Sequence, residues 1–200
     1  MRRVGLLLFD EVEVLDACGP FEVFSVASRI ADVPPFDVVT VSAGPTLTVH
    51  ARGGLPIVAH RLLADAAPVD VVVIPGGVVD RIEHDVAVLR WIRAAAAHAD
   101  VVASVCTGAF PLAASGLLDG LTVTTHWEDQ DELRRRYPTV TVVDGVRYLD
   151  HGRVATSAGV SAGIDLALHL VARFAGERHA VATARQMDYP WAARPARSPA

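Results

Sequence analysis

The chain has 200 residues, 52% of them hydrophobic, with a formal net charge of −5 and no lysine among its 18 basic residues. A chain of this length can bury about 70% of its unfolded surface in a single core, so it needs no disulfide framework. The acidic balance argues against nucleic-acid binding by this chain, and the absence of lysine excludes Schiff-base and P-loop lysine chemistry.

The N-terminal apolar run follows two arginines but ends at Phe9, where three acidic residues occupy the next four positions. It is too short for a signal peptide, and no other run approaches the roughly 18 apolar residues that span a membrane. The two cysteines, Cys18 and Cys106, are too few for a disulfide framework. We therefore expect a cytoplasmic protein without a membrane span.

Apolar runs alternate with helical patterns along the rest of the chain. Strands are predicted at 2–9, 36–42, 69–74, 101–105, 121–125 and 140–143. Helices are predicted at 20–31, 87–99, 108–118, 128–137 and 161–176. This alternation predicts an α/β three-layer sandwich: a flavodoxin-like, mostly parallel sheet of about six strands or more, with helices on both faces.

Two further segments, 46–59 and 146–157, contain turn residues between short apolar stretches and are predicted as hairpins with edge or accessory strands. Trp91 lies in an alanine-rich helix and is expected to be a core or interface residue. The run of arginines at 134–136 is expected on a solvated helix face. We expect one domain over residues 1–191 and a flexible tail rich in proline, alanine and arginine over 192–200.

Cys106 stands where the buried strand 101–105 ends and a helix begins, which predicts a nucleophile elbow, although the G-x-S-x-G spacing is missing. Ligands bind at the carboxyl ends of parallel strands, and the first amides of the following helix point there. Those amides are expected to lower the pKa of the thiol. The alternative is a packed, inert cysteine.

Three other strand ends offer partners for Cys106. Asp16, after the first strand, is either the cap of a helix opened by Gly19-Pro20 or a general acid. The pair Gly76-Gly77 is either a tight turn or an oxyanion-binding loop. His126, at the end of the strand 121–125, is either an ordinary polar residue or a base.

The remaining cysteine and histidines suggest less. If Asp16 approaches Cys106, Cys18 could be a resolving thiol, but burial is the simpler expectation. His126 and Glu128 with Cys106 do not form a recognised metal motif, and we expect no metal. His169 follows Asp165 by four residues, which predicts a pair on one helix face.

Several segments occur in the order typical of one protein family: LDACGPFEVF, VVVIPGG, SVCTGAFPLAASGLLDGLTVTTHW, SAGVSAGIDLALHLV and ARQMDYPW. Together they resemble the ThiJ/PfpI superfamily of class I glutamine amidotransferase-like proteins, from Arg3 to about Trp191. Two branches are similar: the isonitrile hydratases, and the amino-terminal domains of AraC-type regulators, whose helix-turn-helix domain is not expected here. PfpI-type peptidases carry Cys-His-Gly at the elbow, whereas this chain has Cys-Thr-Gly, so a peptidase is disfavoured.

The resemblance implies a homodimeric enzyme for a small-molecule substrate without a cofactor. Cys106, Asp16, Thr107 and His126 are the expected catalytic residues, and Gly76, Gly77 and Thr107 the expected oxyanion-binding ones. The reaction implied is hydration of an isonitrile to an N-substituted formamide through a thioimidate on Cys106. The alternative is a redox-sensing or ligand-sensing protein, and hydrolysis of small aldehydes or amides is a third reading. The segment 156–165 differs from the glycine-rich run of isonitrile hydratases and could line the pocket.

Overall fold

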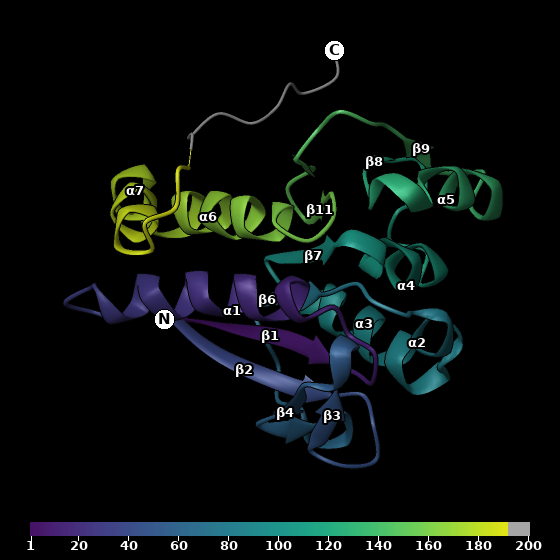
Figure 1. Cartoon of the computed structure of the whole chain (residues 1–200), viewed down its shortest axis with the longest axis horizontal. Coiled ribbons are helices and arrows are strands. Elements are labelled where there is room, and N and C mark those ends of the chain that lie inside the picture. The colour runs from purple at the N-terminus through teal and green to yellow at the C-terminus, as the bar shows by residue number, and fades with distance from the viewer. Residues whose placement is uncertain (192–200) are drawn as a thin grey trace.

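The computed structural model describes residues 1–191, and its centre is one seven-stranded sheet (Figure 1). The strand order is β10-β11-β7-β6-β1-β2-β5. These strands are β1 (Arg2–Leu8), β2 (Phe36–Ser42), β5 (Arg61–Leu62), β6 (Val71–Ile74), β7 (Val101–Val105), β10 (Tyr148–Asp150) and β11 (Val154–Ser157). All neighbours are parallel except β10 and β11, which confirms the predicted mostly parallel sheet.

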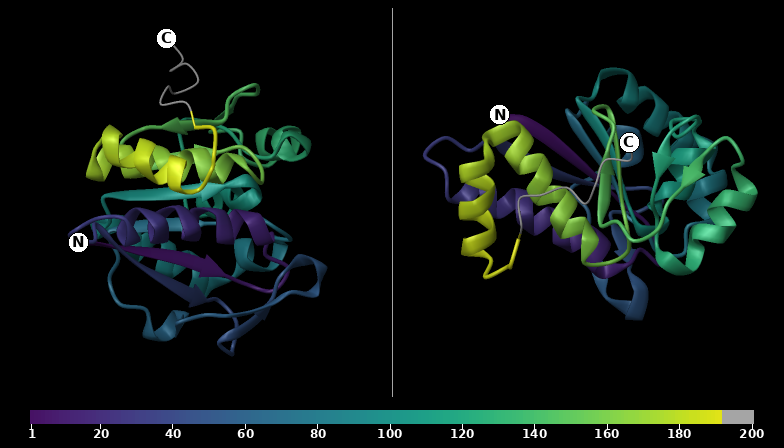
Figure 2. Two further views of the ribbon diagram at one scale, coloured as in Figure 1. Left: turned by 60° about the vertical axis from the view of Figure 1, so that its left-hand side comes forward. Right: turned by 90° about the horizontal axis from the view of Figure 1, so that it is seen from above.

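Two groups of helices cover the sheet, one on each face (Figure 2). The first group is α1 (Val14–Arg29), α6 (Ala162–Ala175) and α7 (Glu177–Gln186). The second is α2 (Asp80–His84), α3 (Val86–His98) and α4 (Ala109–Ala114), and α5 (Gln130–Arg136) lies beside α4 in Figure 1. The predicted three-layer sandwich is therefore confirmed. The tail predicted over 192–200 lies outside the described residues.

The central strands are hydrophobic on both faces because helices cover both. Every residue of β6 and of β7 is buried, as a parallel strand between two helical layers requires. Trp91 on α3 packs partly buried against this core, as expected. Within residues 1–191, no helix combines the length and the hydropathy needed to cross a bilayer.

The two predicted hairpins are present but differ in position. The first forms a separate two-stranded sheet of β3 (Thr48–His50) and β4 (Pro56–Val58), joined by a 3₁₀ turn, η1 (Arg52–Gly54). The second is β10 with β11, and β11 also pairs with β7. Of these two strands, β10 lies at an edge of the main sheet and β11 lies inside it.

The first helix begins six residues earlier than predicted. α1 starts at Val14, so Pro20 lies inside the helix and Asp16 lies in its first turn instead of capping a helix at Gly19-Pro20. An internal proline costs a helix about 3 kcal/mol, and close packing offsets that cost here. A Cβ on Gly19 would lie 3.0 Å from the Ile164 side chain of α6.

The strand predicted at 121–125 is also shorter than expected. β8 (Thr122–Val123) pairs only with β9 (Thr141–Val142) in a small separate sheet. The place beside β7 belongs to β11, which comes later in the chain. His126 therefore lies beyond this strand, just before a 3₁₀ turn, η4 (Trp127–Asp129).

Candidate active site

Cys106 lies at a strained corner between β7 and α4. It opens a 3₁₀ turn, η3 (Cys106–Gly108), and its φ of +57° is left-handed, a conformation that costs a non-glycine residue about 1–3 kcal/mol. The corner is tight because Gly108 passes so close to the Ile74 carbonyl that no Cβ would fit. This geometry is that of a nucleophile elbow, as predicted.

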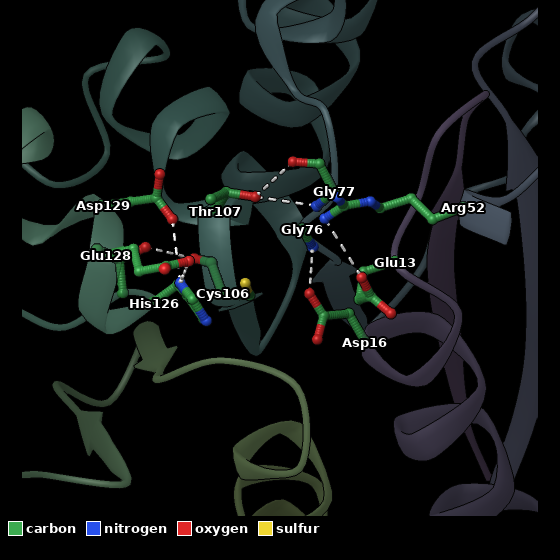
Figure 3. A network of polar contacts seen from close by, with 11 residues as sticks. Glu13, Asp16, Arg52, Gly76, Gly77, Cys106, Thr107, His126, Glu128 and Asp129 are labelled. Carbon is green, nitrogen blue, oxygen red and sulfur yellow. Dashed lines mark hydrogen bonds and ion pairs between the residues drawn. The ribbon is translucent and has the colours of Figure 1, made fainter.

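Asp16 reaches the same edge of the sheet from α1 (Figure 3). Its side chain is completely buried, and its Oδ2 accepts a hydrogen bond of 3.1 Å from the Gly76 amide. Its Oδ1 is buried without a hydrogen-bond partner among the described residues. Burial raises the pKa of Asp16 to about 7, although interactions with the Cys106 thiol and the Gly76 amide act in the opposite direction.

The environment of Cys106 raises its pKa too, which corrects the lowering expected from the sequence. The residue is 6% exposed, and burial followed by the charge of Asp16 raises the thiol pKa to about 12. The amides of Thr107 and Val160 favour the thiolate but do not outweigh these effects. The thiol and the carboxyl are therefore two coupled groups that disfavour each other's charge.

The loop that contains Gly76 and Gly77, the glycine loop, is hydrogen-bonded to the elbow at Thr107. The Gly77 amide donates to Thr107 Oγ1 at 2.9 Å, and that hydroxyl donates to the Gly77 carbonyl at 2.9 Å. Gly76 must lack a side chain, because a Cβ there would lie 2.7 Å from Asp16 Oδ2, Thr107 N and Thr107 Oγ1. Both glycine amides are thus already engaged, and of the amides predicted to face the reacting group only that of Thr107 does so.

Val160 is a site residue that the sequence analysis missed. Its amide favours the charged forms of both Cys106 and Asp16 and so lowers the pKa of each, and its φ of +50° is rare for a β-branched residue. The only signal was its place in the segment 156–165, which was expected to line the pocket. A backbone amide has no side-chain signature, so its role could not be identified from residue type.

His126 occupies the rim of the site. Its ring packs on Gly159, where a Cβ would overlap it, and its Nδ1 lies 3.2 Å from Asp129 and 3.8 Å from Glu128 (Figure 3). Within the described part of the chain, no hydrogen bond or ion pair joins His126 to Cys106 or Asp16. The structure thus ties His126 to acidic partners on η4 instead of the thiol. Among residues 1–191, no three histidine, cysteine or acidic side chains are grouped as a metal would require.

Cys18 is exposed, which corrects the expectation that it is buried. It lies two residues after Asp16 on α1, so it points to a different side of the helix, into an apolar cavity of about 300 Å³ that Phe21 and Ile57 also line. This position does not suit a resolving thiol for Cys106.

One surface prediction, for His169, is wrong, and another, for the arginines at 134–136, holds for Arg134 and Arg135 but not for Arg136. His169 pairs with Asp150 at 2.8 Å, and Asp165 pairs instead with Arg147. Of the three arginines on α5, Arg136 does not face solvent freely, because it pairs with the fully buried Glu83.

Known proteins share both sequence and fold with this chain. A model of the DJ-1/PfpI family matches residues 2–173. An isonitrile hydratase from Pseudomonas putida is 35% identical over 189 residues, covering 94% of this chain and 78% of that protein. The transcriptional regulator CdhR from Pseudomonas aeruginosa is 30% identical over 90% of this chain, which spans about half (53%) of the regulator.

Solved structures agree with this fold. A ThiJ/PfpI family protein from Pseudomonas syringae superposes with a TM-score of 0.83 at 25% identity, covering 94% of this chain and 75% of that one. An AraC family transcriptional regulator from Pseudomonas putida gives a TM-score of 0.79 at 25% identity, covering 94% of this chain and all of that one. Because the family model matches most of the chain and a relative is 35% identical over 94% of it, the chain belongs to the DJ-1/PfpI family.

Proposed function

We propose that the protein hydrates isonitriles to N-substituted formamides, using Cys106 as nucleophile and Asp16 as proton carrier. The observation that carries the proposal is the pairing of a thiol on a left-handed elbow with a fully buried carboxyl whose pKa is raised to about 7. A group with a pKa near neutrality can both accept and donate a proton at physiological pH. The 35% identity to an isonitrile hydratase supports this choice of substrate.

The first step is addition of the thiol to the terminal isonitrile carbon. Asp16 takes the proton from Cys106, the sulfur forms a bond to the carbon, and Asp16 returns the proton to that same carbon. The carbon–nitrogen triple bond becomes a double bond, which gives a thioimidate on Cys106. The amides of Thr107 and Val160, which favour negative charge on the sulfur, stabilise the transient thiolate.

The second step is hydrolysis of the thioimidate. Asp16 removes a proton from water as its oxygen adds to the carbon, and that proton passes to the nitrogen. The carbon–sulfur bond then breaks, the sulfur recovers a proton from the hydroxyl through Asp16, and the N-substituted formamide leaves. One water is consumed and the enzyme returns to its starting state.

Thr107 and His126 have supporting roles in this proposal. The Thr107 hydroxyl accepts from the Gly77 amide and donates to the Gly77 carbonyl, so its role in this proposal is to fix the glycine loop. His126, with its Asp129 and Glu128 partners, contributes to the polar rim where substrate enters. We further propose that the protein works in the cytoplasm as a homodimer.

A second candidate function is ligand sensing at the same site without turnover. It is favoured by the match of CdhR over 90% of this chain. Redox sensing is less well supported, because the raised pKa of Cys106 keeps it a thiol, and thiols oxidise more slowly than thiolates. A sensor would bind an isonitrile or another small electrophile with saturation and release it unchanged.

The deciding experiment is an assay of formamide production from methyl, cyclohexyl and benzyl isonitrile by the purified full-length chain. We expect turnover by the wild type and by Cys18→Ala, and none above background by Cys106→Ala. Turnover that survives in Cys106→Ala would refute the covalent mechanism. Absence of turnover with all three isonitriles would refute the substrate class, and saturable binding in that case would favour the sensor.

A further inference from the structure

A buried charged cluster joins α2 to α5 on the side of the molecule where α4 leaves the elbow. Glu83 of α2 is fully buried, and its Oε1 accepts hydrogen bonds from Arg136 Nη2 at 2.5 Å and from the Tyr137 hydroxyl. Its other oxygen, Oε2, is buried without a partner among the described residues. Beside it, Phe110 of α4 packs edge-on to Tyr137, with ring centroids 6.4 Å apart, and lies 5.2 Å below the Arg136 guanidinium.

The Glu83 cluster is not expected to contribute much to the stability of the fold. Taking a carboxylate and a guanidinium out of water costs more than their attraction returns unless every polar atom is satisfied, and Glu83 Oε2 is not. Apolar side chains of similar volume would hold the helices together at least as well. An ion pair with directed hydrogen bonds instead constrains geometry, because it forms in only one relative orientation of the two helices.

The three elements that meet at the cluster are those that leave the active site. Glu83 follows the Gly76-Gly77 loop by six residues, and Phe110 follows Cys106 by four. Arg136 ends the helix that begins after the His126 turn. Figure 1 shows α2, α4 and α5 gathered at one end of the molecule.

We propose that Glu83 is a positioning residue for the Cys106 site, which acts through Arg136 to hold the glycine loop and the His126 turn at fixed places on either side of the elbow. The inference uses the site of the proposed function but does not depend on its substrate.

The link to chemistry is the glycine loop. The Gly76 amide is hydrogen-bonded to Asp16, and the Gly77 amide to Thr107, so a displacement of α2 pulls on both bonds. Loss of the Gly76 bond raises the proton affinity of Asp16, which leaves more of the shared proton on the carboxyl and less on sulfur. The titratable groups that act on Asp16 are Cys106 and Glu13, and neither belongs to the Glu83 cluster.

The test measures Cys106 itself, through its rate of alkylation by iodoacetamide between pH 6 and 10 in a Cys18→Ser background. We expect Glu83→Ala and Arg136→Ala to alkylate at least about threefold faster at pH 8, with the whole pH profile of the alkylation rate displaced to lower pH by about half a unit. Glu83→Gln, which still accepts from Arg136 and Tyr137, should stay within about twofold of the parent.

Two controls separate positioning from stability. Arg135→Ala removes the neighbouring exposed pair with Glu132, at 3.3 Å, and should change nothing. Leu170→Ala creates a cavity in α6, two turns beyond its start, and should lower Tm without changing the alkylation profile. If Glu83→Ala lowers Tm as Leu170→Ala does and leaves the alkylation rate and profile unchanged, the proposal is wrong.

Should neither alanine variant of the cluster fold, the double variant Glu83→Leu with Arg136→Met decides the question. It replaces the ion pair by apolar side chains of similar volume and leaves no buried charge unpaired, and a rise of at least about threefold in alkylation is expected, whereas an unchanged rate would overturn the proposal. A failure of the wild type to hydrate isonitriles would refute the proposed function alone, because the alkylation measurements do not involve that substrate.

Discussion

The two cysteines of this chain lie in contrasting environments. Cys106 is buried on a strained elbow beside a buried carboxyl, whereas Cys18 is exposed on a helix and lines an apolar cavity. Burial raises the pKa of both thiols, but only Cys106 has a neighbour that can take its proton. In the proposed function, the comparison teaches that the reactivity of Cys106 would come from a proton partner at the right place and not from an acidic thiol.

The largest expected effect is on turnover in Asp16→Asn. An amide cannot carry the proton between sulfur, carbon and water, so we expect formamide production to fall by about 10²- to 10⁴-fold. Cys18→Ser should stay within about twofold of the wild type, because Cys18 points away from the site. Equal losses in the two variants, measured by the formamide assay, would remove the distinction between the two cysteines.

The next effect is on stability and depends on pH. Folded Asp16 keeps its proton up to about pH 7, whereas the unfolded state loses it near 3.8, so this residue lowers the free energy of unfolding as pH rises between those values. The loss is complete above pH 7 and amounts to about 4 kcal/mol at most.

Asp16→Asn should therefore match the wild type near pH 4 and exceed its stability at pH 8 by about 2–4 kcal/mol, measured by urea unfolding at both pH values. Cys18→Ser is the control and should show no such change with pH between 4 and 8. A variant less stable than the wild type at pH 8 would contradict the raised pKa of Asp16.

A smaller effect concerns the order of alkylation. At pH 8, iodoacetamide should modify Cys18 at least about tenfold faster than Cys106, because Cys106 is 6% exposed and its pKa is raised to about 12. Asp16→Asn should narrow this gap about tenfold, since removing the carboxylate charge lowers the pKa of Cys106. Peptide mapping by mass spectrometry over time follows both sites in one sample, and faster modification of Cys106 in the wild type would reverse the comparison.

The smallest effect is expected from Cys18 itself. Because its thiol is exposed, Cys18→Ser should change the free energy of unfolding by no more than about 0.5 kcal/mol. A loss above about 2 kcal/mol in thermal or urea unfolding would show that the apolar cavity around Cys18 depends on this side chain.

Much of the architecture could be predicted because it depends on local pattern. The continuous apolar runs of β6 and β7 identified buried parallel strands, and turn residues identified both hairpins. The errors occurred where distant packing overrides local preference. Pro20 lies inside α1 because α6 packs closely there, and the strand predicted at 121–125 is reduced to β8, which pairs with β9 outside the main sheet.

The candidate site was likewise predictable where it depends on local pattern and not where it depends on distant packing. Residue type and position at strand ends identified Cys106, Asp16 and the glycine pair. Val160 was missed because a backbone amide acts there, and the engagement of Gly77 with Thr107 depends on loops 30 residues apart in the sequence. His126 was placed at the right edge of the sheet, but its partners Asp129 and Glu128 hold it at the rim.

The sequence alone determined the fold class, the elbow and which side chains could react, because hydrophobic periodicity and residue chemistry are local properties. Only the tertiary structure decided the protonation of these side chains. The burial of Asp16 and Cys106 at one sheet edge raises both pKa values, and that direction depends on desolvation and distance between segments 90 residues apart. The ion pair between Glu83 and Arg136 also depends on the tertiary structure, because the local sequence does not indicate which distant helix will contact a buried charge.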